Sequence, residues 1–547
     1  MSISTTTNDS IATKKEQAHR PDWQTILFWT VVIALFAIAI AMRLFKLGLP
    51  FDRDSYDEGV YWQSLRAMGA GHGLYGDIFY SQPPLFLLST YPIYALFGAS
   101  LWSARLGVAV VSLFGLVGAL LLGKALSERL GAGAALLLAV VDPLFLAQSQ
   151  TIQAEASSVA FSFLAMGLAF YWWKYPSGMR GLLLAILTGV TVALSIMCKL
   201  LGVSLLVPVV MLMLARLWLG VPERVGAGLA PALVAGRRTR VRHSPISADR
   251  GDRVRRPYLS VAVGIVAFLL TIALLALPFF GSFQAMWSGV VTFHIEAGTL
   301  LRNNPQLGGS GNTAKVGTAL ASFLTLTALY GCAVALLRRD WRVLPLLGWL
   351  LATGFLLWRQ VPLFPHHFVS LTPPLIALAI VGIAPSIDNQ RAGHKTTVSN
   401  ATVLLTGVAI ILILFTSMLD ARTDLLYYRT ATARGVDGLA QLEARVAADL
   451  DRAITPGQQV VTDAQFIAGL ANRDTPPALV DTSMVRIETG SVTLAQLEAI
   501  TAQPQVHAVL FFTGRFGLPS VAVYHAWVAQ HFHLLHDYGG GMQLWVR

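Results

Sequence analysis

Charged residues are scarce in this sequence. Only 13% of its 547 residues are charged and 55% are hydrophobic, whereas soluble proteins carry about 25% charged residues. The mean hydropathy is +0.60. This composition excludes an ordinary soluble domain and favours a protein that lies within a membrane.

Cysteine is also nearly absent. The chain has two, Cys198 and Cys332, and both lie in apolar runs. Neither a framework of several disulfides nor a metal site built from cysteines can be formed from them.

The sequence has no excess of acidic residues either, because its formal net charge is +11. In a soluble protein this charge would suggest a nucleic-acid partner. Here the arginines lie between apolar runs, where they set the orientation of membrane helices and meet anionic headgroups. We therefore expect the lipid bilayer, and no nucleic acid, as the partner of these charges.

Apolar runs, in contrast, are abundant, and each is near the roughly 20 residues that cross a bilayer. They predict an all-α polytopic membrane bundle over residues 25–419, behind a polar tail at 1–24. The first run is too long and too late for a cleaved signal peptide. About eleven spans are predicted, at residues 25–46, 102–123, 131–148, 157–173, 181–198, 200–218, 259–279, 316–336, 343–358, 367–384 and 402–419.

The loops orient this bundle through the positive-inside rule. The arginine-rich segment 219–257 is expected in the cytoplasm together with the tail 1–24. The first loop, 48–101, and the C-terminal segment, 420–547, then lie outside the cytoplasm. We expect a multi-pass protein of the plasma (inner) membrane.

One apolar stretch conflicts with this orientation if it is a span. Residues 83–97 are interrupted by Pro83, Pro84 and Pro92, and a span here would place 219–257 outside. We therefore expect a helix that lies at the interface or is partly re-entrant.

The segment 420–547 differs in kind from the bundle. Short β-like runs at 458–462, 506–513 and 542–546 alternate with helical runs at 435–452, 493–503 and 519–531. This alternation predicts a small α/β domain outside the membrane.

Carboxylates are concentrated in the first outer loop. Five of them lie within 26 residues, namely Asp52, Asp54, Asp57, Glu58 and Asp77. Charges that border apolar segments are costly and are often functional. An ordinary solvated loop is the alternative interpretation.

The order of residues in this loop favours a function. The pair Asp57–Glu58 is followed by Tyr61, by the glycine-rich stretch from Gly71 to Asp77, and by Pro83–Pro84. This order resembles the protein O-mannosyltransferase-like family, which includes the aminoarabinose transferases of lipid A. Its members are C-type membrane glycosyltransferases that use a dolichyl- or undecaprenyl-phosphate sugar. The similarity continues to about residue 200 and more weakly to about 385.

The resemblance implies transfer of a sugar, mannose or a pentose-like one, to a hydroxyl of a protein, lipid or glycan on the outer face, with inversion. It implies that Asp57 is the base, that Glu58 and Glu155 are further catalytic residues, and that Tyr61 and Asp77 bind substrate. A carboxylate can take the hydroxyl proton as the new bond forms. Glu155 is expected on the same side of the membrane as Asp57, although an acid at a helix start also suits the helix dipole.

The lipid phosphate needs positive charge. The family often has a lysine before Pro-Pro, but this chain has Gln82, whose amide binds through hydrogen bonds and supplies no charge. The remaining candidates for phosphate binding are Lys199, Arg302, Arg359, His366 and His367. For Lys199 the alternative is snorkelling to the interface, and for the two histidines it is a simple interfacial position. Adjacent histidines are poor metal spacing, so no metal or other cofactor is predicted, with a divalent ion left open.

Two other classes of function compete with this interpretation. A transporter or lipid flippase would also carry intramembrane charges, but it should show inverted repeats or paired broken helices near the middle of the membrane. A sensor whose C-terminal domain binds a ligand would give no reason for the acidic loop motif.

Overall fold

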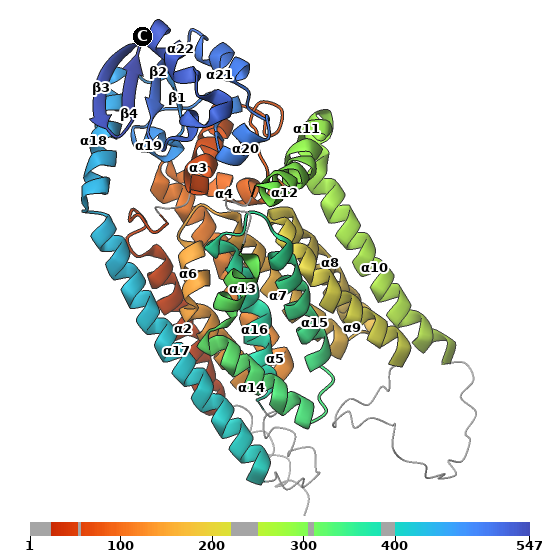
Figure 1. Cartoon of the computed structure of the whole chain (residues 1–547). Helices are drawn as coiled ribbons and strands as arrows, with labels where there is room; N and C mark the ends of the chain where they lie inside the picture. The colour runs from red at the N-terminus through yellow and green to blue at the C-terminus, as the bar shows by residue number, and fades with distance from the viewer. Residues whose placement is uncertain (1–22, 53–55, 220–249, 305–310, 384–399) are drawn as a thin grey trace, which may run out of the picture.

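The computed structural model describes residues 23–52, 56–219, 250–304, 311–383 and 400–547. A bundle of helices forms most of the molecule, and an α/β domain made by the C-terminal residues covers one end of it (Figure 1). This is the expected fold class.

The bundle consists mainly of apolar helices, because only a helix satisfies every backbone hydrogen bond within one segment in lipid. These helices are α2 (Trp23–Leu44), α5 (Leu101–Val141), α7 (Ala154–Lys174), α8 (Gly178–Cys198), α9 (Leu206–Leu219), α10 (Arg250–Ala276), α14 (Phe323–Leu337), α15 (Val343–Arg359), α16 (Thr372–Val381) and α17 (Asn400–Arg434). Other helices outside the C-terminal domain are α3 (Tyr56–Gly69), α4 (Leu85–Phe97), α6 (Pro143–Ser149), α11 (Phe283–Trp287), α12 (Phe293–Asn303) and α13 (Asn312–Leu320).

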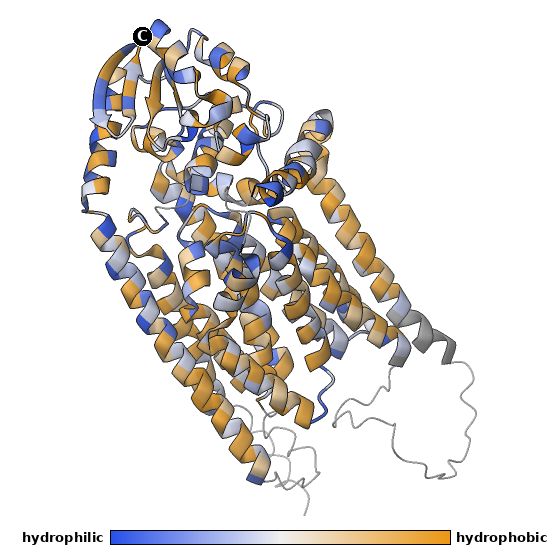
Figure 2. Cartoon of the chain, viewed as in Figure 1, coloured by the Kyte–Doolittle hydropathy of each residue, from blue (hydrophilic) through white to orange (hydrophobic). Residues whose placement is uncertain are grey.

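Among the described residues, seven helices are long and apolar enough to cross a membrane, or eight if the bent pair α13 and α14 forms one span. The other predicted spans correspond to the second half of α5 and to the shorter apolar helices 343–359 and 365–381. The ribbons of the bundle are coloured mostly as hydrophobic in Figure 2. Apolar side chains lie on its outside, for example Ile33 and Ile411, which are 66% and 65% exposed.

Helix α5 is a hairpin with two arms. It breaks at Ser127 and Glu128, where the backbone is not helical. Gly123 and Gly131 meet across the two arms: a Cβ on Gly123 would lie 2.2 Å from the carbonyl oxygen of Gly131. Only residues without a side chain allow this approach, so the two predicted spans 102–123 and 131–148 pack closely side by side.

The first outer loop folds into α3 and α4. Helix α4 has 13 residues, fewer than a span needs. Pro84 precedes it, Pro92 lies inside it, and Gly98, with a φ of 89°, ends it. It fits the short helix that was expected at residues 83–97, and together with α3 it lies between the bundle and the C-terminal domain (Figure 1).

The C-terminal domain is built on a four-stranded sheet with the order β1-β2-β4-β3. The strands are β1 (Gln459–Thr462), β2 (Val506–Phe511), β3 (His533–Gly539) and β4 (Met542–Val546). Strand β1 is parallel to β2, and the other two pairings are antiparallel. Strands β1, β2 and β4 coincide with the predicted β-like runs, whereas β3 was not predicted.

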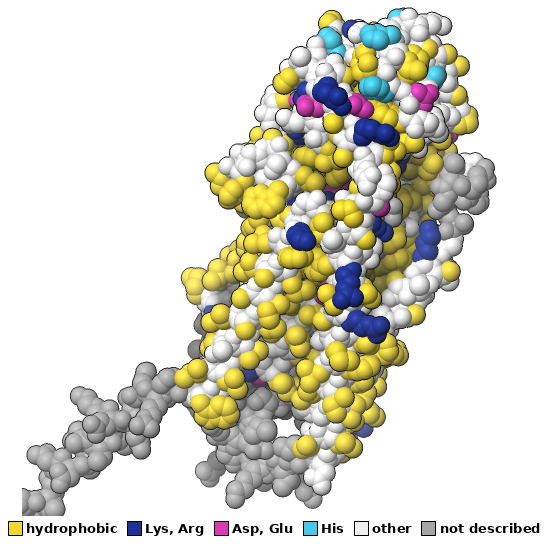
Figure 3. All heavy atoms as spheres, turned by 90° about the vertical axis from the view of Figure 1, so that its left-hand side faces the viewer, with side chains coloured by type: hydrophobic (Ala, Val, Ile, Leu, Met, Phe, Trp, Pro, Cys, Tyr) yellow, Lys and Arg dark blue, Asp and Glu magenta, His cyan; other side chains and the backbone are white. Residues whose placement is uncertain are grey.

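Helices cover both faces of this sheet. They are α18 (Gly438–Ala453), α19 (Gln465–Leu470), α20 (Met484–Glu488), α21 (Leu494–Thr501) and α22 (Tyr524–His531). Along β2, Val509 and Phe511 enter one apolar core while Ala508 and Leu510 enter the other, as the two-residue period of a strand requires. Figure 3 shows histidine and acidic side chains gathered on this domain, above the apolar side of the bundle.

Helix α17 joins the two parts without a break. Its first half carries the predicted span 402–419, and its second half continues beyond it toward the C-terminal domain (Figure 1). Tyr427 stacks on Phe51 with ring centroids 5.2 Å apart, and the Tyr428 hydroxyl donates to the Met42 carbonyl at 2.6 Å. These contacts fix the upper part of α17 against the residues that follow α2.

Candidate active site

The acidic pair of the first outer loop stands at the start of a helix. Asp57 and Glu58 occupy the first turn of α3, where the positive end of the helix dipole favours carboxylates. Consecutive residues of a helix point about 100° apart. The two carboxylates therefore have different surroundings, although they are neighbours in the sequence.

Glu58 points into the bundle and pairs with an arginine. Arg105 of α5 binds both of its carboxylate oxygens, with distances of 2.8 Å and 2.7 Å, and the two side chains are 0% and 3% exposed. The Ile152 amide donates to the same carboxylate at 3.0 Å. Glu58 thus connects α3 to α5 and to the short segment between α6 and α7 that contains Ile152.

Glu155 opens α7 and is buried beside a lysine. Lys199, between α8 and the 3-10 turn Leu200–Leu205, donates a hydrogen bond from its Nζ to Glu155 Oε1. The Glu155 side chain is 1% exposed and the Lys199 side chain is 8% exposed. Hydrogen bonds between Ser158 of α7 and Ser195 of α8 hold these helices together one turn further into the bundle.

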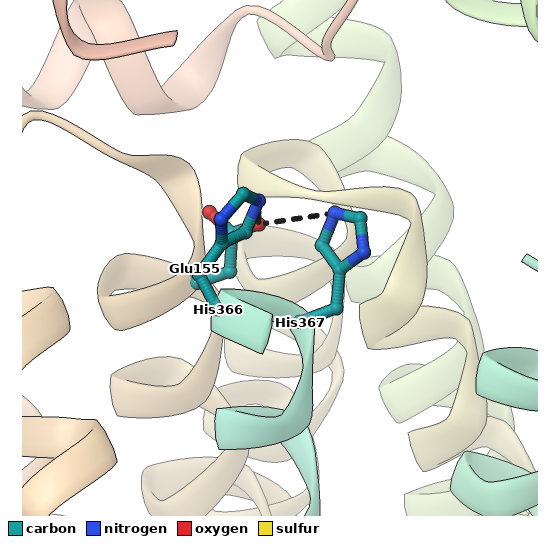
Figure 4. Close-up of side chains that lie close together, drawn as sticks. All are labelled: Glu155, His366 and His367. Atoms are coloured by element: carbon teal, nitrogen blue, oxygen red, sulfur yellow. Dashed lines mark ion pairs between the residues drawn. The ribbon is translucent and has the colours of Figure 1, made fainter. Parts of the chain in front are cut away.

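Two histidines reach the same place from a third segment. His366 and His367 lie in the 3-10 turn Pro365–Leu371, which leads into α16. Their Nε2 atoms lie 3.5 Å and 3.6 Å from Glu155 Oε1 (Figure 4). His367 is anchored because its Nδ1 accepts the Phe364 amide at 3.2 Å. His366 Nε2 has no hydrogen-bond partner within the part of the chain that the structure describes.

Asp57 completes the cluster from the side of the outer loop. Its Oδ2 lies 3.9 Å from His366 Nε2, and 38% of its side chain is exposed. It is therefore open to an incoming molecule, unlike Glu58 and Glu155. Enclosure by the surrounding protein nevertheless raises the pKa of Asp57, while the charges of His366 and Lys199 act against this rise.

The charge of this cluster is unbalanced. With neutral histidines, the carboxylates of Asp57 and Glu155 and the ammonium of Lys199 leave one formal negative charge in a site formed by mostly buried side chains. A phosphate cannot enter such a site favourably unless a positive charge is added. His366, close to both carboxylates, would supply one if it became protonated.

The same side chains offer a set of metal ligands. One ligand atom each from Glu155, His366 and His367 lies within 4.8 Å of the other two. Carboxylate and imidazole donors of this kind suit a divalent transition metal. However, the ammonium of Lys199 already binds Glu155 Oε1, so these residues could hold an ion only if Lys199 moved away.

The other residues of the loop motif shape the loop. Tyr61 is buried, with its ring 5.2 Å from Phe86 and 6.0 Å from Tyr80. Asp77 is exposed and accepts the Gly73 amide at 2.8 Å. The backbone carbonyl of Gln82 accepts the Tyr75 hydroxyl at 2.7 Å. The glycine-rich stretch is thus a closed turn held by Asp77 and Tyr75.

The two arginine candidates are not part of the cluster. Arg302 and Arg359 are exposed, and neither forms a hydrogen bond or ion pair with Asp57, Glu155 or Lys199. The distal end of the loop is instead bound by His294, whose Nε2 lies 2.7 Å from the Ser81 carbonyl oxygen.

Two residues next to the site were not predicted from the sequence. Arg105 stands within a long apolar run, and a charge in such a run usually has a partner; this signal points to Glu58. Asp481 of the C-terminal domain lies close enough for its charge to add to the pKa rise of Asp57 that burial causes. No sequence signal distinguishes Asp481 from the other acids of that domain.

Solved structures of similar fold are membrane glycosyltransferases. ArnT from Cupriavidus metallidurans bound to undecaprenyl phosphate aligns with a TM-score of 0.53 at 15% identity, over 95% of this chain and 97% of that chain. The oligosaccharyltransferase of Archaeoglobus fulgidus in its apo form aligns with a TM-score of 0.53 at 15% identity, over 91% and 71%. The chain has the architecture of C-type membrane glycosyltransferases.

Part of the chain also matches a family of known proteins. Residues 72–226 match the family described as "Dolichyl-phosphate-mannose-protein mannosyltransferase", which confirms the resemblance expected from the loop motif. The matched segment contains Asp77, Glu155 and Lys199 and begins after Asp57. No curated protein matches the chain. The chain is therefore similar to this family over the matched segment, and it shares its fold with solved glycosyltransferases.

Proposed function

We propose that the chain transfers a sugar from a polyprenyl-phosphate donor to a hydroxyl acceptor at the end of the bundle that the C-terminal domain covers. One observation carries this proposal. The half-exposed carboxylate of Asp57 faces a buried cluster that contains a carboxylate, a lysine and two histidines. This arrangement can hold a phosphate beside a base.

The chemistry is a single displacement. The acceptor hydroxyl gives its proton to the Asp57 carboxylate while its oxygen attacks the anomeric carbon. The bond between that carbon and the phosphate oxygen breaks, and the lipid phosphate leaves with the electron pair. A single displacement inverts the anomeric configuration. The raised pKa of Asp57 brings this carboxylate closer to the pKa of an efficient base at neutral pH.

The donor phosphate binds between Lys199 and His366 in this proposal. Lys199 exchanges part of its hydrogen bond with Glu155 for a bond to the phosphate, and protonation of His366 supplies the missing positive charge. Glu155 holds Lys199 in place before the donor arrives. Glu58, saturated by Arg105, positions α3 and does not touch substrate.

The donor sugar is mannose or a pentose-like sugar, and the acceptor is a protein, a lipid or a glycan. The reaction takes place on the outer face of the plasma (inner) membrane, where the C-terminal domain also lies. The family match of residues 72–226 supports a mannose-type donor, and the fold shared with ArnT supports a lipid-linked one.

The test of this proposal is a transfer assay with Asp57→Asn. Purified full-length protein is incubated with radiolabelled undecaprenyl-phosphate mannose or undecaprenyl-phosphate aminoarabinose and with membrane extract as the source of acceptor. Asp57→Asn should lower turnover by about 10²–10⁴-fold and leave binding of undecaprenyl phosphate intact, because the amide keeps the size of the side chain.

Asp52→Asn is the matched control. Asp52 lies in the same loop and accepts a hydrogen bond from Gln153 at 3.1 Å; it is not one of the side chains of the cluster, so its variant should keep most of the activity. Asp54, outside the described residues, serves as a second control. Near-normal turnover in Asp57→Asn would refute the assignment. Movement of the lipid across liposomes without sugar transfer would indicate a flippase instead.

A further inference from the structure

Helix α3, which carries the proposed base Asp57, is held by contacts with the C-terminal domain. Tyr56, Gly59, Gln63 and Arg66 of α3 recur at three- and four-residue spacing, so they lie along one face of the helix. Each of these residues contacts the C-terminal domain. Asp57 stands at the edge of this face.

The first contact is adjacent to Asp57. The Tyr56 hydroxyl accepts the Thr482 amide at 2.7 Å and lies 3.0 Å from the Thr482 hydroxyl. The guanidinium of Arg515 lies over the Tyr56 ring, 4.0 Å from its centre. Thr482 is itself fixed, because its hydroxyl donates to the Thr462 carbonyl at the end of β1 at 3.0 Å.

The second contact is a close approach of two helices. A Cβ on Gly59 would lie 2.5 Å from the backbone nitrogen of Phe466 in α19, so only glycine fits. The Phe466 ring packs edge-on against Trp62 of α3, with centroids 5.6 Å apart.

Hydrogen bonds and an ion pair continue the contact with the domain further along α3. The side-chain amide of Gln63 donates to the Arg473 carbonyl at 3.1 Å, and its oxygen accepts the Thr475 amide at 3.3 Å. Arg66 pairs with Asp474 at 2.7 Å. Four successive positions of the helix face thus have partners in the domain.

The opposite partners of α3 belong to the bundle. Glu58 binds Arg105 of α5, and Tyr61 packs on Phe86 of α4. The residues that Asp57 must work with, Glu155, Lys199 and His366, also belong to the bundle. The distance from Asp57 to these groups therefore depends on how α3 is held, on one side by its ion pair with α5 and on the other by its contacts with the domain.

We propose that the C-terminal domain is a working part of the catalytic centre: through Tyr56, Gly59 and Gln63 it holds α3 so that Asp57 faces His366 and the donor site. This inference rests on the proposed role of Asp57 as the base. Tyr56, Gly59 and Gln63 are positioning residues, and Thr482 and Phe466 are their partners in the domain. A displacement of about 1 Å at a reacting group can cost on the order of 100-fold in rate.

The first experiment introduces a steric clash between α3 and the C-terminal domain. Gly59→Ala places a methyl group against Phe466, whereas Gly69→Ala adds the same group at the end of the same helix, where a Cβ would meet nothing within 4 Å. In the full-length protein, Gly59→Ala should lower kcat by about 10- to 100-fold. Binding of undecaprenyl phosphate should change little, because Lys199 and Glu155 do not move. Gly69→Ala should match the wild type in both.

The second experiment removes one hydroxyl. Tyr56→Phe leaves the ring beside Arg515 and deletes only the bond to Thr482. Tyr524→Phe deletes a buried hydroxyl, 2.6 Å from the Thr501 hydroxyl inside the domain. Tyr56→Phe should lower kcat and shift the acidic limb of the pH profile to lower pH, because a displaced Asp57 is less enclosed. Tyr524→Phe should lower thermal stability without moving the pH profile.

The outcomes separate this inference from the proposed function. If Asp57→Asn is inactive while Gly59→Ala and Tyr56→Phe behave like their controls, the domain does not position the base and the inference fails alone. If Asp57→Asn keeps its activity, the proposed base is wrong. Equal losses of kcat in Tyr56→Phe and Tyr524→Phe would also overturn the inference, because general destabilisation would then explain both.

Discussion

Lys199 is bound to a carboxylate before any donor arrives. Its ammonium has two possible partners, Glu155 and the donor phosphate, and a lysine can serve both because it carries three donor hydrogens. The pair is nearly inaccessible to water, with exposed fractions of 8% and 1%. A new negative charge in such surroundings is therefore felt strongly by Lys199.

Removal of this ammonium should weaken lipid binding. We expect Lys199→Ala to raise the Kd for undecaprenyl phosphate roughly tenfold or more, since hydrogen bonds to charged groups contribute about 1.5–3 kcal/mol. Lys174→Ala is the matched control. Lys174 ends the same helix that Glu155 begins, and it pairs with Glu128 at 3.0 Å on the surface. Equal affinities for the two variants in a lipid-binding assay would exclude Lys199 from the phosphate site.

The environment of Asp57 also predicts how kcat/KM depends on pH. A base works only in its ionised form, and burial raises the pKa of this carboxyl above its ordinary value, which is about 3.9. As the pH falls, Asp57 therefore takes up a proton earlier than a free aspartate does. We expect kcat/KM to fall on the acidic side through an apparent pKa above about 3.9.

This limb can be assigned by substitution. A pH series of kcat/KM measured on the wild type should show the acidic fall, and the residual activity of Asp57→Asn should not show it. The Asp52→Asn variant should keep the wild-type profile. An acidic limb that persists unchanged in Asp57→Asn would belong to another carboxylate, with Glu155 of the same cluster the first candidate.

Individual site residues were predictable where the chemistry requires a rare residue type. Asp57, Glu155, Lys199, His366 and His367 come from four separate segments, and the structure brings them together as the assumed orientation of the loops requires. Arg302 and Arg359 were candidates for their charge alone, and they lie exposed. Contacts between distant segments, such as Glu58 with Arg105, depend on packing that one-dimensional patterns do not contain.

At the scale of elements, α3 is fixed on the bundle by one buried ion pair. Breaking such a pair leaves an unpartnered charge in the interior, which costs about 3–5 kcal/mol. We expect Glu58→Gln to lower the thermal stability of the protein in lipid nanodiscs strongly. Asp474→Asn breaks the other ion pair of α3, whose aspartate side chain is 41% exposed, and should cost at most about 1 kcal/mol.

The same variant tests what Glu58 does. The protein that remains folded after Glu58→Gln should lose much less turnover than Asp57→Asn does, because Glu58 does not reach the donor site. Normal stability together with a turnover loss as large as that of Asp57→Asn would show that Glu58 takes part in the chemistry, as the loop motif originally indicated.

Elements were predictable where their sequence has a regular apolar pattern. The apolar runs predicted the bundle helices well, and even the hairpin within α5 corresponds to two predicted spans. Strand β3 was missed because its sequence, His533–Gly539, carries three charged or histidine side chains and is exposed along almost its whole length. An exposed edge strand of this kind has no alternating apolar pattern, so only its pairing with β4 defines it.

At the scale of the whole molecule, the orientation in the membrane stays a prediction. The arginine-rich segment 219–257 should face the cytoplasm and the C-terminal domain should face outward. Single cysteines at Ser247, outside the described residues, and at exposed Ser520 would report this. In intact cells a membrane-impermeant maleimide should label only Ser520→Cys.

The native thiols favour this experiment, because Cys198 and Cys332 are both buried. After permeabilisation, Ser247→Cys should be labelled as well. Labelling of both positions in intact cells, or of neither, would refute the topology and with it the assignment of the cluster to the outer face.

Helix α17 also sets the height and the direction of the C-terminal domain. With 35 residues it is about 52 Å long, against about 30 Å for the hydrocarbon layer, so its length sets the height of the domain above the lipid. Its helical phase sets the direction in which the domain faces. One inserted residue would raise the domain by about 1.5 Å and turn it by about 100°. In a chimaera that exchanges the C-terminal domain between related enzymes, the joint must therefore preserve the length and phase of this helix.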